Sequence, residues 1–311
     1  MKKCLGLVLI ALTLSANAQV KKDTCLIGIY LKALYDLSPS DFSFGADFYI
    51  WNNCKDSISL FKKVEITNAK KIDDYSSFND KDGNSFVSYE NCKAQLRQKW
   101  NLKKYPFDKQ TLEIAIEAQD NTDLMLLRED QNNFQLANDL KISGWRITDH
   151  HIEKSITTYT NDFGYHNNPK KNRSYNQLKF VIELTRESWG LYFKLFSGLY
   201  IAFFVSFLAF FVKPEFVDPR FGLSIGGLFA SVANKYVVDA NIPATTSFSF
   251  VDMVHFTSFF FILATLIVST ISLKLYSKGK TDESRRLDSR ASIMVLLLYI
   301  VLNIILIIAI H

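Results

Sequence analysis

The chain lacks the motifs on which the common enzyme classes depend. Its 311 residues contain no nucleophile elbow, no phosphate-binding glycine loop and no cluster of residues with metal-ligand spacing. His150 and His151 are adjacent in an expected strand, where neighbouring side chains point to opposite faces, so they form a poor chelating pair. The sequence therefore predicts a protein that is not an enzyme, with no cofactor and no bound metal.

The N-terminus has the three parts of a secretory signal peptide. Lys2 and Lys3 form a basic start, residues 5–14 form an apolar core, and Ala16-Asn17-Ala18 provides a small-residue cleavage site. The apolar core is too short to span a bilayer. We expect residues 1–18 to be removed, which places the following region outside the cytoplasm.

Cysteine is scarce, because the chain has four and Cys4 would leave with the signal peptide. The other three lie in a region exposed to an oxidising compartment, where a disulfide is expected. Cys25 and Cys54 are equally distant from the centre of an expected hairpin turn at residues 38–41, so they would lie opposite each other. This favours a Cys25–Cys54 disulfide, while a Cys54–Cys92 disulfide and three free thiols stay open.

Residues 19–188 contain no convincing amphipathic helix. They show short runs in which apolar and polar residues alternate, separated by turn sequences such as residues 80–84. Strands are expected at residues 25–34, 44–54, 64–67, 85–100, 111–117, 145–159 and 175–186. The pattern predicts an all-β, immunoglobulin-like sandwich as the first domain.

Long hydrophobic runs are confined to residues 189–311, the expected transmembrane domain. Helices that span a membrane need ~20 residues, and such spans are expected at about 191–212, 219–239, 250–276 and 291–310. The loop after the third span is rich in Lys and Arg, whereas the loop after the second has neither. The positive-inside rule therefore places the first domain and the C-terminus outside the cytoplasm. We expect a multi-pass protein of a bacterial inner membrane with a periplasmic domain, and the net charge of +5 does not point to nucleic acid.

The second span makes a poor lipid-facing helix. Residues 216–243 carry charged and amide side chains and three glycines. A helix of this kind is usually shielded by other helices or lines a wet cavity. At helical spacing, one face holds Gly222, Gly226, Phe229, Ala233 and Tyr236, with Asp218 and Asp239 just beyond its ends. One interpretation is a pore helix with a hydrophobic gate, and the other is a face of small residues that packs against a second helix.

Several motifs of the chain resemble those of a known family. Tyr105-Pro106-Phe107-Asp108-Lys109-Gln110 resembles the F-P-F-D-x-Q signature of the pentameric ligand-gated ion channels, the Cys-loop receptor superfamily. Further motifs that resemble the family follow the family's order: residues 28–31, Gly144-Trp145, Arg186, residues 219–223 and residues 238–243. Gln98 and Leu112 stand where the animal receptors have their loop cysteines, so the Cys-loop disulfide is absent, as in the prokaryotic members.

The resemblance implies a homopentamer, with five second helices around a central pore and five sandwiches in a ring outside the membrane. The partners of each chain would be four identical subunits, membrane lipid and permeant ions. Five Phe229 rings would form a dry constriction that gates by dewetting, and five Asp218 side chains would favour cations. In the family the basic position of Arg220 usually faces away from the lumen. The implied pore-lining residues are Asp218, Gly222, Gly226, Phe229, Ala233, Tyr236 and Asp239.

The resemblance also implies where a signal passes between the two domains. Arg186 is expected to pair with Asp108 through a charge-assisted hydrogen bond. The turn at residues 38–41 is expected to join this contact. The implied gating and coupling residues are Tyr105, Pro106, Phe107, Asp108, Arg186 and Pro243.

The resemblance further implies a ligand site between adjacent sandwiches, under a flap that would lie at residues 159–176 here. Aromatic and acidic residues near that flap suit a small cationic ligand through cation–π contact and opposite charge. The segment between residues 51 and 105 has no W-x-P motif, which normally supplies one wall of the pocket, so gating by protons is an alternative. The candidate ligand-binding residues are Trp51, Glu117, Asp120, Tyr159, Tyr165 and Tyr175.

Two functions follow from this reading. The first is a ligand-gated or proton-gated ion channel that leans towards cations and passes a signal from the periplasmic domain to the second span. The alternative is a non-conducting pentameric periplasmic sensor of the same fold. The glycine-rich face, Phe229 and the incomplete pocket motivate the alternative.

Overall fold

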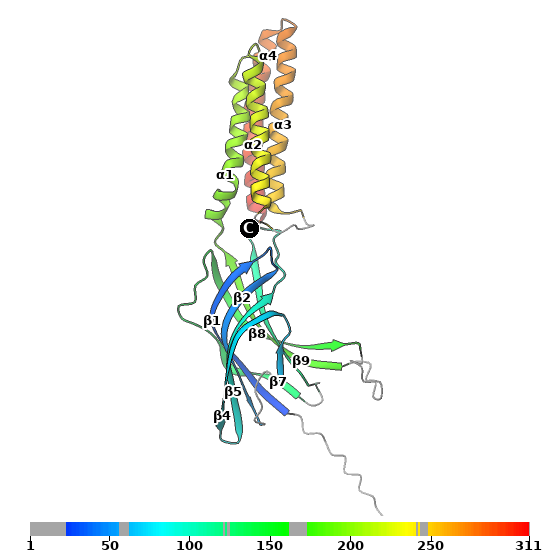
Figure 1. Cartoon of the computed structure of the whole chain (residues 1–311). Coiled ribbons are helices and arrows are strands. Elements are labelled where there is room, and N and C mark those ends of the chain that lie inside the picture. The colour runs from blue at the N-terminus through cyan, green and yellow to red at the C-terminus, as the bar shows by residue number, and fades with distance from the viewer. Residues whose placement is uncertain are drawn as a thin grey trace, which may run out of the picture.

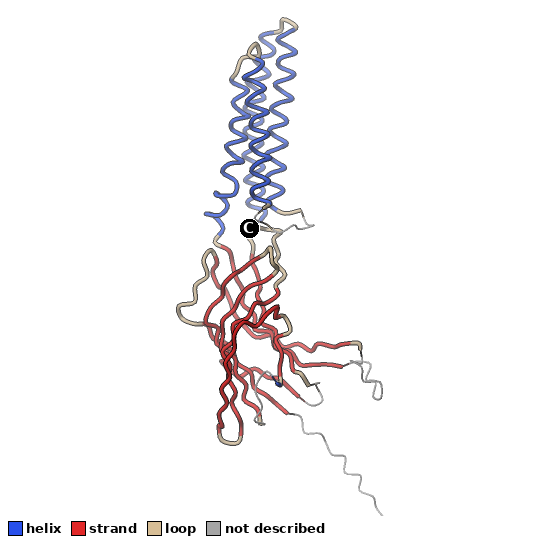
Figure 2. The backbone as a smooth tube through the Cα atoms, viewed as in Figure 1, coloured by secondary structure: helices blue, strands red, loops and turns tan. Residues whose placement is uncertain are grey.

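A computed structural model describes residues 23–55, 62–120, 122, 125–161, 173–240, 242 and 248–310. The expected signal peptide, residues 1–18, lies outside these ranges. The described chain forms a sandwich of strands and, beyond it, a bundle of long helices (Figures 1 and 2). The end of the last helix returns to the junction between the two parts (Figure 1).

The described residues of the first part contain nine strands in two sheets. One sheet has the order β4-β5-β2-β1-β7 and the other the order β3-β6-β9-β8. Among these strands only β1 and β7 pair in parallel. The expected sandwich architecture is therefore confirmed. The strands are β1 Asp23–Ser38, β2 Ser43–Cys54, β3 Val64–Ile66, β4 Ala69–Asp82, β5 Ser85–Arg97, β6 Lys109–Ala118, β7 Met125–Leu136, β8 Trp145–Tyr159 and β9 Arg173–Arg186.

The core of the sandwich lies between the two sheets, because inward and outward side chains alternate along the strands. Phe44 and Phe48 of β2 and Phe180 and Ile182 of β9 are fully buried there. Complete burial of such a side chain contributes roughly 1.5–3 kcal/mol. These positions therefore fix which face of each strand points inward, and with it the direction of every outward side chain.

β1 and β2 form a hairpin around residues 39–42. Leu26 lies opposite Asn53, and a disulfide joins the neighbouring Cys25 and Cys54. Cys92 is buried on β5, outside this disulfide. The disulfide thus links two strands that are already paired.

The alternation pattern missed two strands, β4 and β7. Both lie at the edges of the larger sheet. Most described side chains of β4 are exposed, and β7 carries a polar run in its middle. The exposed β4 therefore gives a weak sequence signal, as edge strands often do. In β7 the polar run separates the buried Met125 and Leu127 from the buried Phe134, which hides the alternation. The strand expected at residues 85–100 ends at Arg97.

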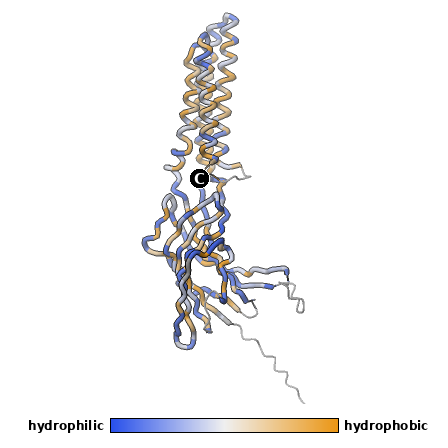
Figure 3. Tube along the Cα trace, in the orientation of Figure 1, coloured by the Kyte–Doolittle hydropathy of each residue, from blue (hydrophilic) through white to orange (hydrophobic). Residues whose placement is uncertain are grey.

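The second part contains helices that are long and apolar enough to cross a membrane. The helical segments are α1 Ser188–Phe207, η2 Leu208–Phe211, α2 Val217–Asp239, α3 Phe250–Ser277 and α4 Thr281–Ile310. With η2 continuing α1, four candidate spans result within the described residues. Apolar residues run along all of them (Figure 3). The chain therefore has the organisation of a multi-pass membrane protein.

The expected basic loop between the third and fourth spans is mostly helical. Arg285, Arg286 and Arg290 lie in the first turns of α4, which begins well before the apolar run at residue 291. A helix continues beyond the bilayer where its polar side chains meet water, and acidic side chains in its first turn stabilise it through the helix dipole. The connection shrinks to residues 278–280, where Gly279 takes a left-handed conformation with φ of 79°.

Candidate functional site

α2 packs one face against the other helices and leaves the opposite face uncovered. Its buried residues are Arg220, Ser224, Gly227, Ser231 and Val238. Phe229 and Tyr236 lie on the opposite side and are 70% and 74% exposed. All seven residues that the resemblance assigned to a pore are exposed in the chain: Asp218, Gly222, Gly226, Phe229, Ala233, Tyr236 and Asp239.

The glycines of α2 divide between these two faces. A Cβ added at Gly227 would lie 2.6 Å from the backbone oxygen of Ala202, so α1 and α2 approach there at backbone contact. At Gly222 and Gly226, by contrast, no atom of the described chain lies within 4 Å of an added Cβ. Close helix packing therefore uses Gly227, which was not on the face proposed from the sequence, while the two glycines of that face pack against nothing described within the chain.

The basic residue near the start of α2 points into the bundle. Arg220 is fully buried and donates two hydrogen bonds to Asp288 of α4, at 2.9 and 2.6 Å. It also donates to the carbonyl oxygen of Val212, while Ser272 donates to Asp288 at 2.8 Å. The Arg220 charge is thus neutralised away from the uncovered face. Sequence reasoning missed Asp288, because it assigned that residue to a loop.

Charged side chains join the C-terminal end of α2 to α3. Lys235 lies 2.6 Å from Asp239 and 2.7 Å from Asp252, which forms a capping box with the N-cap residue Ser249 at the start of α3. The adjacent Asn234 hydrogen-bonds His255 of α3 at 3.0 Å and donates to the carbonyl oxygen of Leu195 of α1 at 3.2 Å. Lys235 therefore offsets the charge of Asp239.

The loop between β5 and β6 inserts an aromatic side chain between the sandwich and the helices. Phe107 follows the cis peptide bond between Tyr105 and Pro106. Its ring lies 5.3 Å from that of Trp189, 5.6 Å from that of Tyr192 and 5.8 Å from that of Phe250. The first two belong to α1 and the third begins α3. Phe107 therefore contacts the helices on both sides of α2 in the chain.

An ion pair lies next to this aromatic contact, because Asp108 follows Phe107 in the chain. Arg186, the last residue of β9, donates to Asp108 at 2.6 and 3.1 Å, as the resemblance implied. Asp108 is 1% exposed and also accepts from Gln110 at 2.6 Å. The Arg186 guanidinium lies over the rings of Trp145 and Tyr105, at 3.9 and 4.9 Å. Burial raises the pKa of Tyr105 above its usual value.

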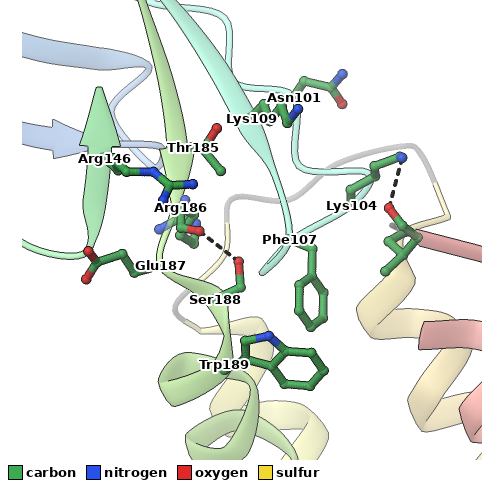
Figure 4. A pocket seen from close by; sticks show the side chains of 11 residues that line it. Asn101, Lys104, Phe107, Lys109, Arg146, Thr185, Arg186, Glu187, Ser188 and Trp189 are labelled. Carbon is green, nitrogen blue, oxygen red and sulfur yellow. Dashed lines mark hydrogen bonds between the residues drawn. The ribbon is translucent and has the colours of Figure 1, made fainter. Parts of the chain in front are cut away.

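A cavity of about 570 Å³ opens beside this ion pair, between the sandwich and the helices (Figure 4). Lys104, Lys109 and Arg146 lie on its wall with Glu187 and Trp189. The Lys104 ammonium donates to the carbonyl oxygen of Ile310 at 2.9 Å, which ties the end of α4 to the sandwich. The junction thus joins α1, α3 and α4 to the loop that carries Phe107.

For two expected parts of the junction, Pro243 and the turn at residues 38–41, the described chain shows no contact with the helices. Pro243 lies outside the described residues, although the nearby Ile242 packs against the same hydrophobic cluster as Tyr105 and Phe107. Among the described contacts, the turn at residues 38–41 bonds within itself and to Lys70 rather than to the helices. The expected contribution of this turn to the interdomain contact is therefore not seen in the described chain.

Three of the predicted ligand residues, Glu117, Tyr159 and Tyr175, converge where β6 and β8 end and β9 begins. Tyr159 donates to Glu117 at 2.9 Å, and its ring meets that of Tyr175 at 5.6 Å. Gln177 donates to the second Glu117 oxygen at 3.3 Å. Glu117, Tyr159 and Tyr175 border a cavity of about 250 Å³ together with Glu65, a residue that sequence reasoning missed. Burial, followed by the bond to Glu117, raises the pKa of Tyr159 to about 12, so Tyr159 stays a phenol at neutral pH.

The other predicted ligand residues lie elsewhere. Trp51 belongs to the opposite sheet and donates to Asp130 at 3.0 Å. Asp120 is exposed beyond the end of β6 and does not border the cavity. Tyr165 lies outside the described residues. Within one chain, the candidate ligand site therefore consists of Glu117 and the two tyrosines, while Trp51 lies on another surface.

Comparison with known proteins shows a weak sequence similarity to an ion channel. No family model matches the chain. The chain is 21% identical over 245 residues to the proton-gated ion channel of Gloeobacter violaceus, an alignment that covers 78% of this chain. The chain aligns with 65% of that relative's length, slightly less than two thirds. The similarity supports a relationship to ligand-gated channels at the level of the family.

Proposed function

We propose that the chain is a subunit of a homopentameric ion channel of the ligand-gated family, opened by a small cationic ligand or by protons. The β-sandwich lies in the periplasm, and the helices lie in a bacterial inner membrane. The motifs around Pro106 and Asp108, the order of the domains and the similarity to a proton-gated channel support this assignment. The number of subunits follows from the family resemblance.

The observation that carries the proposal is the uncovered face of α2. This face holds exposed Asp218, the open backbone of Gly222 and Gly226, and a single large apolar ring, Phe229. Lipid would solvate the Asp218 carboxylate and the exposed backbone at the two glycines poorly, because unsatisfied polar groups cost several kcal/mol in hydrocarbon. A closed ring of identical subunits turns this face towards a central, water-filled axis. In that ring Phe229 forms the narrow apolar gate.

The charges near α2 favour cations at the inner mouth. Asp218 is exposed in the first turn of α2, whereas the charge of the nearby Arg220 is taken up by Asp288. Five Asp218 carboxylates therefore face the inner mouth without an opposing basic ring from Arg220. At the outer mouth Lys235 offsets Asp239, so selection rests mainly on the inner ring.

A signal reaches α1 and α3, the helices on either side of α2 in the chain, through contacts that run along the sandwich. Glu117 and Tyr159 border the ligand cavity, and β9 pairs with both of their strands. The same β9 ends in Arg186, whose partner Asp108 is adjacent to Phe107. A cationic amine that enters the cavity contacts the Glu117 carboxylate and the tyrosine rings. Trp51, on the opposite sheet, would come from the neighbouring subunit.

The test is ion flux from proteoliposomes that contain wild type or Phe229→Ser, with and without an acid step and an amine. A hydroxyl at the gate hydrates the constriction, so Phe229→Ser leaks ions without a stimulus, whereas wild type conducts only with one. Phe260→Ser is the matched control, because Phe260 is 59% exposed on α3, a helix without a role in the proposed pore. It should not leak.

The absence of ion flux from both wild type and Phe229→Ser, in protein shown to be a folded pentamer, would contradict the proposal that the protein conducts ions. That outcome would favour a non-conducting sensor of the same fold. The specific observation behind this alternative is that the uncovered face of α2 carries no serine or threonine hydroxyl among its pore-assigned residues.

A further inference from the structure

The outward face of β8 and β9 carries a compact group of metal-binding side chains. Asp149, His151 and Glu153 alternate along β8, so they point to the same side of the sheet. Glu183 of β9 lies directly opposite Asp149. His150 belongs to the other face, where its ring meets that of Phe134 at 5.3 Å. The partners of His151 are therefore carboxylates two residues away and across the strand pair, and not the adjacent histidine.

The ligand atoms of three of these residues already lie close together. One atom each from Asp149, His151 and Glu183 falls within 4.8 Å of the others. A Zn²⁺ ion holds nitrogen and carboxylate ligands at about 2.0–2.2 Å, so two ligands of one ion are at most about 4.4 Å apart. The Asp149 and Glu183 side chains are exposed and need only small rotations to reach that spacing.

Both ring nitrogens of His151 lie near carboxylates, an arrangement that is common for histidines in metal sites. Its Nδ1 lies 3.1 Å from Asp149, and its Nε2 lies 3.4 Å from Glu153. In metal sites the ring nitrogen that does not bind the ion commonly donates to a carboxylate, which fixes the orientation of the ring. Glu153 occupies that position when Nδ1 binds the ion with Asp149 and Glu183.

The charge of the group is not balanced by basic side chains. Like charges directly opposite each other on paired strands destabilise the pair, and Asp149 and Glu183 are such a pair. In the described chain, no Lys or Arg lies within 4.0 Å of either carboxylate. The nearby Lys179 is engaged by Glu113 at 2.9 Å, and Lys154 by Glu129 at 2.5 Å.

We propose that Asp149, His151 and Glu183 form a surface site for a divalent transition metal ion, with Zn²⁺ as the best-fitting ion and Glu153 orienting the histidine. One imidazole nitrogen with two carboxylate oxygens suits such an ion, whereas Ca²⁺ and Mg²⁺ prefer oxygen alone. Water fills the remaining positions. The bound ion links β8 to β9 just before Arg186, the residue that pairs with Asp108. The site does not depend on the proposed channel function.

The experiment is calorimetric titration of the full-length protein in detergent with Zn²⁺ alone. Wild type binds one ion per subunit saturably. His151→Ala and Glu183→Gln each weaken binding by about tenfold or more, and Glu153→Gln also weakens it, as loss of an orienting partner costs about 10- to 100-fold. His150→Gln is the matched control, because it removes an imidazole from the opposite face, and binding stays unchanged.

Two further measurements keep the proposal falsifiable without relying on the variants. Cu²⁺ bound to wild type shows coupling to one histidine nitrogen in its electron paramagnetic resonance spectrum. Ca²⁺ binds more weakly than Zn²⁺. The proposal is overturned by absence of saturable Zn²⁺ binding, by binding that His151→Ala and Glu183→Gln leave intact, or by equally tight Ca²⁺ binding that ignores His151→Ala.

Discussion

Arg220 and Asp288 form a bidentate ion pair inside the helix bundle, with N–O distances of 2.9 and 2.6 Å, and this pair joins the start of α2 to α4. Replacement of Asp288 by Asn leaves the buried guanidinium without a counter-charge. Loss of one partner of a buried pair costs about 3–5 kcal/mol. We expect a clear drop in the unfolding temperature of the detergent-solubilised protein, measured by differential scanning fluorimetry.

The double variant Arg220→Met with Asp288→Leu serves as the control for this pair. It removes both charges and fills the space with apolar atoms, so it should recover most of the stability lost by Asp288→Asn. An Asp288→Asn protein as stable as wild type would show that the pair does not hold α2 in place.

Gly226 and Gly227 provide a matched pair on adjacent positions of α2. An added methyl group at Gly227 collides with the Ala202 backbone at 2.6 Å, whereas none of the described atoms lies within 4 Å at Gly226. Overpacking costs typically about 1–3 kcal/mol, while replacement of Gly by Ala in a helix gains about 1 kcal/mol. Thermal unfolding should therefore separate Gly227→Ala, destabilised, from Gly226→Ala, neutral or stabilised. Equal effects would argue against the assigned faces.

The pair of Arg186 and Asp108 is expected to transmit the stimulus. Asp108→Asn keeps the shape and the bond from Gln110 but removes the charge that holds Arg186. Stimulated flux in proteoliposomes should fall strongly. The combined variant Asp108→Asn with Phe229→Ser should still leak, since its pore is open without a signal. Loss of that leak would instead indicate a pore that fails to assemble.

The ligand cavity makes a separate prediction. Glu117→Gln keeps the size of the side chain but removes the charge next to Tyr159 and Tyr175. Because a charged partner roughly doubles the strength of a hydrogen bond, affinity for a primary amine should fall about tenfold or more in a calorimetric titration. Asp120→Asn is the control, since Asp120 does not border the cavity. Equal losses in both variants would point to a general charge effect.

The sequence predicted most of what depends on hydrophobic period. Alternating residues such as Phe180 and Ile182 predict the inward face of β9, and the apolar runs predict the membrane-spanning helices. The two missed strands, β4 and β7, lie at the edges of the larger sheet. β4 is mostly exposed, and a polar run separates the buried residues of β7, so neither shows a continuous period. The start of α4 was missed because hydropathy reports where a helix meets lipid and not where its hydrogen bonds begin.

Partners brought together by the fold were harder to predict. Asp288 lies 68 residues from Arg220 in sequence, and a local pattern does not connect them. The same holds for Glu183 beside His151, which become neighbours through the register of β8 and β9. Arg186 and Asp108 could be paired in advance only because the family resemblance supplied the contact.

The measurement that tests the central claim most directly is a cysteine scan along α2 with a charged, water-soluble thiol reagent in membranes. Cysteine at Gly226, Phe229 or Ala233 should react, whereas cysteine at the buried Ser224 or Ser231 should not, and the background is low because Cys92 is buried. A reactive face that follows the uncovered side of α2 is the predicted result. If positions 226, 229 and 233 resist the charged reagent but react with a lipid-soluble one, that face contacts lipid and α2 does not line a pore.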